Sequence, residues 1–129
     1  SVMEGVAFGM RDSLELIKDL GVEPTQIRIT GGGSKSPVWR QVMADEFNQA
    51  VVTTNIEEGP AIGAALLAGV GVGTYASVEE AVSEIVEVTD STEPNKRRVE
   101  KYEGIYPLFG NLYQSLKPNY EEVFNFFNM

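Results

Sequence analysis

Gly31, Gly32 and Gly33 are consecutive glycines between a strand-like segment and a helical pattern. Residues 26–30 alternate apolar and polar side chains, and residues 36–48 repeat apolar side chains at helical spacing. Glycine has no Cβ, so a ligand can approach its backbone closely. Helix N-termini carry free N–H groups and a positive dipole end, which suit phosphate. In parallel α/β sheets such turns lie at the carboxyl ends of strands, where ligands bind. The pattern therefore indicates a contact with nucleotide phosphate.

The same residues also fit a turn with no ligand. The segment is not a P-loop, because no G-x-x-x-x-G-K-[ST] occurs in the chain. It is not G-x-G-x-x-G either, since Lys35 and Ser36 stand where that motif continues. Ser36 suits the N-cap of a helix and Pro37 its first position. From these residues alone, ligand contact and turn chemistry both remain open.

Composition excludes several classes of function. The chain has 129 residues, which suits one domain, and a formal charge of −9, which repels nucleic-acid backbones. The one basic run, residues 96–98, is more typical of a solvated surface. No apolar run is long enough to span a membrane, and no signal peptide is visible. We therefore expect no nucleic-acid partner, no membrane span and a cytoplasmic location.

The chain contains neither cysteine nor histidine. Disulfides, thiolate nucleophiles, Cys/His zinc sites and Ser-His-Asp triads are therefore excluded within it. Three pairs of adjacent glutamates begin at Glu57, Glu79 and Glu121. Adjacent residues on a helix do not face one another, and acidic residues near helix starts are favoured by the dipole. We interpret these pairs as structural, and predict no catalytic residue and no metal site in the chain.

The order of predicted elements indicates an α/β fold. Strands are expected at 26–30 and 50–54, and helices at 2–20, 36–48 and 60–70. Strands and helices that alternate with short links predict a short parallel sheet covered by helices. The helix at 60–70 consists almost wholly of small or apolar residues, so we expect it to be buried.

The last third of the chain is predicted to be mainly helical. Ser77 and Glu80 form a capping-box pattern before a short helix, followed by a brief extended segment at 86–89 and a loop at 90–95. An aromatic stripe then marks a long helical face. Pro107 is expected to kink this helix and Pro118 to break it before a last short helix. Aromatic residues at helical spacing favour packing in a core or an interface over a ligand platform.

Three segments in this order resemble the C-terminal region of FGGY-family carbohydrate kinases. They are EGVAF at Glu4–Phe8, ITGGGSKSPVWRQVMAD at Ile29–Asp45 and EEGPAIGAALLAGVGVGTYAS at Glu57–Ser77. The tail around Tyr106-Pro107-Leu108 is also similar. Within the family, the resemblance is strongest to the xylulose kinases, and it covers essentially the whole chain.

The resemblance implies an actin-like, ribonuclease-H-like ATPase fold with ATP in a cleft between two domains. Residues 1–129 would be part of the C-terminal domain on the nucleotide-binding side, with 95–129 a C-terminal helical extension. Gly59 and Pro60 would flank the same crevice as the glycine turn. The residues implied to contact the nucleotide are Gly31, Gly32 and Gly33 at the phosphates, and Ser36 and Lys35 near the ribose or adenine.

The resemblance also implies what lies outside this chain. In the family, the N-terminal domain supplies the sugar pocket and the aspartate that acts as general base. Asp12, Asp19, Asp45 and Asp90 match no catalytic motif of the family. The cofactor would be ATP with Mg, whose ligands have no counterpart here. The intact protein is expected to convert ATP and D-xylulose to ADP and D-xylulose 5-phosphate, and this chain alone to be inactive.

Two alternatives remain open. One is a kinase of another sugar or polyol, such as ribulose, gluconate or glycerol. The other is a non-catalytic interaction module, for which the aromatic C-terminal region is the evidence. In either case a homo-oligomer is a further expectation, formed through the free edge of the strand at 26–30 or through the surface from Tyr102 to Phe127.

Overall fold

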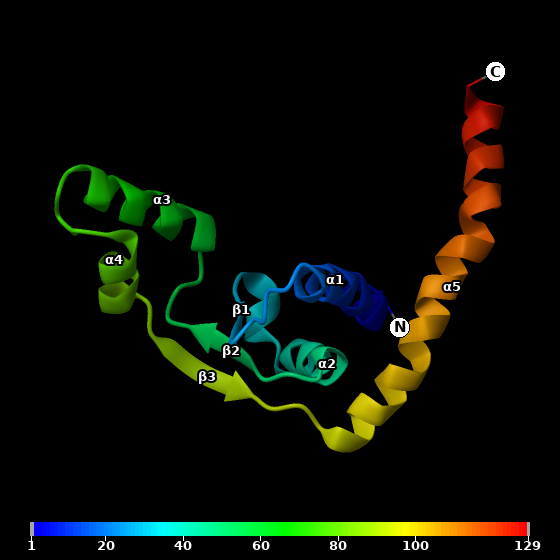
Figure 1. The fold of residues 1–129 in the computed structure, drawn as a ribbon, viewed down its shortest axis with the longest axis horizontal. Helices are drawn as coiled ribbons and strands as arrows, with labels where there is room; N and C mark the ends of the chain where they lie inside the picture. Colours follow the sequence, from blue (N-terminus) through cyan, green and yellow to red (C-terminus); the bar gives the residue numbers. More distant parts are fainter. Residues whose placement is uncertain (1, 129) are drawn as a thin grey trace.

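The computed structural model describes residues 2–128. Its elements in chain order are α1 (Val2–Asp19), β1 (Ile27–Ile29), the 3₁₀ helix η1 (Gly32–Lys35), α2 (Pro37–Phe47), β2 (Val51–Thr54), α3 (Gly59–Gly71), α4 (Val78–Ile85), β3 (Val88–Thr92) and α5 (Lys96–Phe127). Figure 1 shows the sheet in the middle, α1 and α2 on one side of it, α3 and α4 toward the other, and α5 extending away from the body. Within residues 2–128 no helix is long and apolar enough to cross a membrane.

The sheet is mixed and has the strand order β1-β2-β3. β1 and β2 pair in parallel, with Ile27 opposite Val51, which confirms the predicted parallel pair. β3 pairs antiparallel with the other edge of β2, in the region predicted as a short extended segment and a loop. Its sequence, VTDST, is polar and mostly exposed, so no apolar alternation identified it as a strand. The free edge of β2 supplies the hydrogen-bond partners that make this segment a strand.

The core lies between α1, α2 and one face of the sheet. Ile29 points into this core, whereas Arg28 on the same strand faces α3, as the alternation of a strand requires. The buried cluster consists of Ala7, Ile29, Met43, Ala44, Phe47 and Val51. The two parallel strands are therefore fixed by apolar packing on one face, and their carboxyl ends are fixed with them.

The local signals for helix starts are confirmed. The Ser36 Oγ accepts a hydrogen bond from the Trp39 backbone N–H at 3.3 Å, with proline at the start of α2. The Ser77 Oγ accepts one from the Glu80 N–H at 3.2 Å at the start of α4. Such caps depend on residues three positions apart, so the sequence alone is sufficient to predict them.

The prediction that the third helix is buried is wrong. Leu66 is the buried residue of α3, while Leu67 has 63% of its surface exposed. α3 contacts α4, a cavity lies between α3 and the end of the sheet, and most residues of α3 are exposed or half-buried. Small apolar residues allow a neighbour to approach closely, but they do not show that a neighbour is present.

The predicted break at Pro118 is also wrong, because α5 is one helix that continues through Pro107 and Pro118. Figure 1 shows that it bends along its length without ending. A proline inside a helix removes one hydrogen bond and costs about 3 kcal/mol. The remaining hydrogen bonds of a 32-residue helix, and the docking of its first half on α1 and α2, offset that cost.

Candidate functional site

Two turns follow the parallel strands and meet at the same edge of the sheet. β1 leads into Gly31 and η1, and β2 leads through residues 55–58 into α3. Parallel strands present their carboxyl ends together, which is where α/β folds bind ligands. The strand–turn–helix arrangement predicted for residues 26–48 is therefore confirmed. Its role in binding remains a prediction.

The two turns are in contact. The Lys35 Nζ lies 2.8 Å from the Glu57 Oε2, so an ion pair joins η1 to the segment before α3. A Cβ added to Gly59 would lie 3.6 Å from the Thr30 Oγ1 at the end of β1. Both side chains of the ion pair are more than 60% exposed, so the pair contributes only about 0–1 kcal/mol. Lys35 can therefore exchange Glu57 for another anion at little cost.

A cavity of about 200 Å³ separates this end of the sheet from α3. Arg28 is the charged residue among those that line it. Thr30 and Thr54, at the ends of the two parallel strands, contribute polar groups, and the lining is otherwise apolar. The remaining lining residues are Ile56, Gly59, Ile62, Gly63, Leu66 and Val86.

The three glycines of the turn have three different explanations. Gly31 has a φ of 78°, a left-handed value that side chains other than glycine adopt only with strain. A Cβ on Gly33 would lie 2.9 Å from the Trp39 Cδ1 and Nε1, so packing within the chain excludes a side chain there. A Cβ on Gly32 would meet nothing within 4 Å. Backbone conformation therefore explains Gly31 and packing against Trp39 explains Gly33, while Gly32 leaves its backbone open to a ligand.

The two serines of the turn are engaged in the fold. The Ser34 Oγ donates a hydrogen bond to the Gly31 carbonyl oxygen at 2.7 Å, which stabilises the tight turn. Ser36 is half-buried as the N-cap of α2. Of the predicted site residues, Gly32, Gly33 and Lys35 are exposed, whereas Gly31 and Ser36 are half-buried and Ser36 has a structural role as the N-cap of α2.

Arg40 is a residue that sequence reasoning missed. Its Nη1 donates to the Ser34 carbonyl oxygen at 3.0 Å, and its Nη2 donates to the Asp90 Oδ2 at 3.1 Å. Arg40 thus ties the glycine turn to β3. No signal in the sequence indicated this clamp, because the Ser34 carbonyl belongs to the backbone and Asp90 was predicted to lie in a loop.

Asp45 is a second residue with an unpredicted role. It is 1% exposed, and its carboxylate accepts hydrogen bonds from the Gln41 Nε2, the Asn95 backbone N–H and the Arg98 Nε. Asp45 therefore anchors the start of α5 to α2. Its role is therefore structural, because it holds the first residues of α5 against α2.

Glu46 is the strongest electrostatic anomaly of the described chain, and it lies near the end of α2 opposite to the glycine turn. Its side chain is fully buried, and neither carboxylate oxygen has a hydrogen-bond partner. Burial and the nearby Glu4 carboxylate raise the pKa of Glu46 to about 8, and the positive charge of Arg11 partly opposes this. Among residues 2–128, no three His, Cys, Asp or Glu side chains gather as a metal site.

Comparison with known families gives these observations a common explanation. The sequence signature of the FGGY family of carbohydrate kinases, C-terminal domain, matches residues 1–72. This range contains α1, the two parallel strands and both turns. The chain belongs to the FGGY family of carbohydrate kinases.

FGGY kinases with related sequences and structures extend the match to α5. The chain is 35% identical to the xylulose kinase of Bacillus subtilis over 117 residues, which cover 91% of this chain and 23% of that protein. It superposes on a xylulose kinase from Rhodospirillum rubrum with a TM-score of 0.77 and 29% identity, covering 92% of this chain and 24% of that one. It superposes on a gluconate kinase from Lactobacillus acidophilus with a TM-score of 0.84 and 28% identity, covering 95% of this chain and 25% of that one. The chain therefore has the fold of part of an actin-like sugar kinase, and spans about a quarter of the length of these FGGY proteins.

Proposed function

We propose that this chain is the nucleotide-binding part of an ATP-dependent xylulose kinase. The proposed intact protein transfers a phosphoryl group from MgATP to D-xylulose and releases ADP and D-xylulose 5-phosphate. Family membership and the 35% identity to the Bacillus subtilis xylulose kinase support this proposal. Residues 1–129 would belong to the C-terminal kinase domain, with 95–129 as a helical extension, in a cytoplasmic protein.

The observation that carries the proposal is the open backbone of Gly32 beside the two joined turns. Gly31, Gly32 and Gly33 would lie against the nucleotide phosphates. Lys35 would leave Glu57 and neutralise phosphate charge, while Ser36 would hold the start of α2 near the ribose or adenine. Bound ATP supplies the phosphoryl group, and this chain supplies positioning and charge stabilisation, which dominate catalysis of phosphoryl transfer.

The remaining parts of the reaction are proposed to lie outside this chain. These are the sugar pocket, the general base and the Mg ligands. We therefore expect the chain alone to show background activity in a coupled assay with ATP and xylulose. Turnover that survives purification and is lost in Gly32→Val would contradict this proposal.

A nucleotide titration tests the proposed site directly. We expect ATP to shift the NMR signals of residues 31–36 first, with millimolar or weaker affinity, about −4 kcal/mol at best, because one wall of the cleft is absent. Gly32→Val should weaken this binding without disturbing the fold. Gly9→Val is the matched control, since Gly9 is also exposed with nothing near its Cβ position. Gly33→Val is less informative, because its side chain would displace Trp39.

Gluconate is a second candidate for the sugar substrate. A gluconate kinase and a xylulose kinase from Lactobacillus acidophilus superpose on this chain with the same TM-score of 0.84, so structural similarity supports both sugars equally. Comparing kcat/KM for xylulose, ribulose, gluconate and glycerol in the protein that carries the complete kinase would decide between them. A preference for gluconate would replace xylulose and leave the nucleotide site unaffected.

A non-catalytic interaction module is the remaining candidate, and the exposed aromatic residues of α5 favour it. ATP-induced shifts confined to α5, or association without any nucleotide binding, would support this candidate against the kinase.

A further inference from the structure

A buried acid and a buried base, both with unused hydrogen-bonding atoms, lie where α1, α2 and α5 pack together. Glu46 of α2 has no exposed surface, and neither of its carboxylate oxygens has a hydrogen-bond partner. Arg11 of α1 is 7% exposed, and its Nε and Nη1 also lack hydrogen-bond partners. Buried polar atoms without partners are rare in folded proteins, so this pair calls for an explanation.

Arg11 links α1 to α5 through only part of its guanidinium group. Its Nη2 donates to both carboxylate oxygens of Glu103, and its Cζ lies 4.1 Å from the centroid of the Tyr106 ring. The Glu15 Oε1 is 3.9 Å from the Arg11 Nε, which is too long for a hydrogen bond. Arg11 therefore holds α5 with one nitrogen and has two further nitrogens that can donate to a second acceptor.

The surroundings of Glu46 keep its carboxyl group protonated. Glu4 on α1 and Asp45 on α2 add negative charge, whereas Arg11 and the amino terminus of the chain add positive charge. On α5, Tyr102 also interacts electrostatically with Glu46, and its hydroxyl group donates to the Glu4 Oε1 at 3.0 Å. Burial is the largest influence, and the pKa of Glu46 is raised to about 8.

The other side chains of this junction do not change charge near pH 8. Burial and a carboxylate acceptor raise the pKa of Tyr102 to about 12 and that of Tyr106 to about 12. Arginine stays protonated in proteins, and the chain has no histidine or cysteine. Glu46 is therefore the side chain of this junction that can respond to a change in pH in this range.

We propose that Glu46 and Glu103 compete for Arg11, so that ionisation of Glu46 transfers the Arg11 guanidinium from α5 to α2 and loosens the docking of α5. A buried carboxylate without a partner is strongly destabilising, so ionised Glu46 has the greater need of the positive charge. The Glu103 side chain is 47% exposed, and water can replace Arg11 there at little cost. The proposal rests on α1, α2 and α5 and does not require the kinase proposal.

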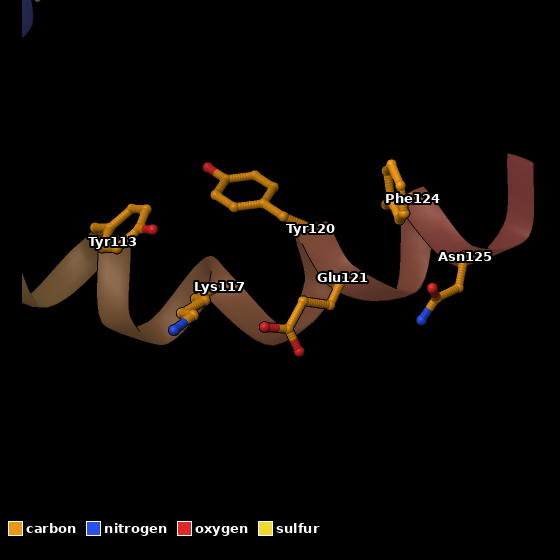
Figure 2. Close-up of a pocket in the computed structure, with 6 residues that line it drawn as sticks. All are labelled: Tyr113, Lys117, Tyr120, Glu121, Phe124 and Asn125. Carbon is orange, nitrogen blue, oxygen red and sulfur yellow. The ribbon is translucent and has the colours of Figure 1, made fainter. Parts of the chain in front are cut away.

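The second half of α5 does not compensate for the loss of Arg11, because residues 111–128 are all exposed. Figure 2 shows the side chains that project from this half, with the Tyr113 and Tyr120 rings on one side of the helix and Lys117 on the other. The ring contacts with Phe8 and the Asp45 anchor remain when Arg11 leaves. Ionisation of Glu46 should therefore loosen the first half of α5 without releasing its start.

An NMR titration of the full chain from about pH 6 to about pH 10 tests the exchange of partners. We expect the Glu46 carboxyl carbon and the Arg11 Nε to titrate together, with a midpoint near pH 8. In Glu46→Gln the Arg11 signal should stay constant, although this variant retains the amino terminus, and α-amino groups titrate at about 7.7–8.0. An Arg11 signal that does not follow Glu46 in the original chain would overturn the proposal.

Glu103→Gln separates competition from the effect of burial alone. With its partner on α5 weakened, Arg11 should pair with Glu46 at lower pH, so the midpoint of the Glu46 titration should fall by about one unit. Glu100→Gln removes the same charge from α5, but Glu100 is exposed and is not the partner of Arg11. Its midpoint should stay near that of the original chain. Equal midpoints in the two variants would reject the competition.

Amide hydrogen exchange measures the consequence for α5. After correction for the pH dependence of chemical exchange, protection of residues 100–109 should fall roughly tenfold between about pH 6.5 and about pH 9. Glu46→Gln should abolish this fall. Protection that stays constant in the original chain would show that Arg11 bridges both carboxylates without loosening α5, which would overturn the proposal and leave the nucleotide titration unaffected.

Discussion

Both halves of α5 carry aromatic residues, but their environments are opposite. In the first half, Tyr102, Tyr106 and Phe109 surround Phe8 of α1, with ring centroids 5.9, 5.8 and 5.3 Å away. The Arg11 Nη2 adds an ion pair by donating to both carboxylate oxygens of Glu103, at 2.8 and 2.9 Å. In the second half, every residue from 111 to 128 is exposed. Helical periodicity therefore predicts an apolar face, whereas the partner of that face depends on residues far away in the sequence.

The largest expected effect comes from Phe8→Ala, which removes the ring at the centre of the docked half. Loss of a buried phenylalanine should lower the free energy of unfolding by about 3–5 kcal/mol. Phe124→Ala is the matched control in the exposed half, and should change it by less than about 0.5 kcal/mol when the chain is monomeric. Urea unfolding at low protein concentration measures both, and equal losses would remove the distinction between the two halves.

Asp45→Asn should have the next largest effect, because it weakens the anchor at the start of α5. Asn cannot provide the charged acceptor that Arg98 and the Asn95 N–H share, so we expect a loss of about 2–4 kcal/mol. Glu121→Gln makes the same chemical change in the exposed half and should be nearly neutral. Amide hydrogen exchange at residues 96–100 reports on this anchor. If the exchange were unchanged in Asp45→Asn, the first half of α5 would not depend on Asp45.

Glu46 makes the docked side of the molecule sensitive to pH. Its pKa is about 8 in the folded chain and 4.5 ordinarily, so the folded state retains a proton that the unfolded state has released. Stability should therefore fall as pH rises from about 4.5 to about 8 and then level off. We expect Glu46→Gln to match the original chain near pH 5 and to exceed it above pH 8 by about 1–3 kcal/mol. If the free energy of unfolding changed with pH in the same way in both proteins, Glu46 would be excluded as the cause of the pH dependence.

The smallest effect concerns the glycine turn, whose contacts are also mostly exposed. Glu57→Gln removes a negative charge beside the proposed phosphate site and frees Lys35, so ATP binding should strengthen by about two- to fivefold. Stability should barely change. Glu79→Gln, an exposed glutamate in α4, is the control. Weaker ATP binding in Glu57→Gln would mean that the ion pair itself shapes the site.

Features that depend on neighbouring residues could be predicted, and features that depend on distant partners could not. Ser36 and Ser77 were identified as caps because their partners lie three residues away. The parallel pair β1–β2 followed from the strand–helix–strand order. β3 was missed because its strand conformation depends on the edge of β2. The continuity of α5 through Pro118 was missed because a local rule was applied to a helix with many other hydrogen bonds.

The candidate site shows the same division. The sequence indicated the glycine run, but only the packing of Trp39 separates Gly33 from Gly32. Lys35 was implied by family resemblance, while its ion pair with Glu57 depends on the approach of two turns. Asp45 received no catalytic assignment from the sequence, and its role as an anchor became visible only with α5 in place.

Arg40 has a consequence for motion, because one guanidinium holds both the Ser34 carbonyl and the Asp90 carboxylate. β3 is a polar edge strand, which is the kind of element that opens first in native-state fluctuations. When β3 detaches, the glycine turn loses its clamp at the same moment. The turn and the strand then behave as one cooperative opening unit, so the lifetime of the ordered glycine turn depends on how long β3 stays paired with β2.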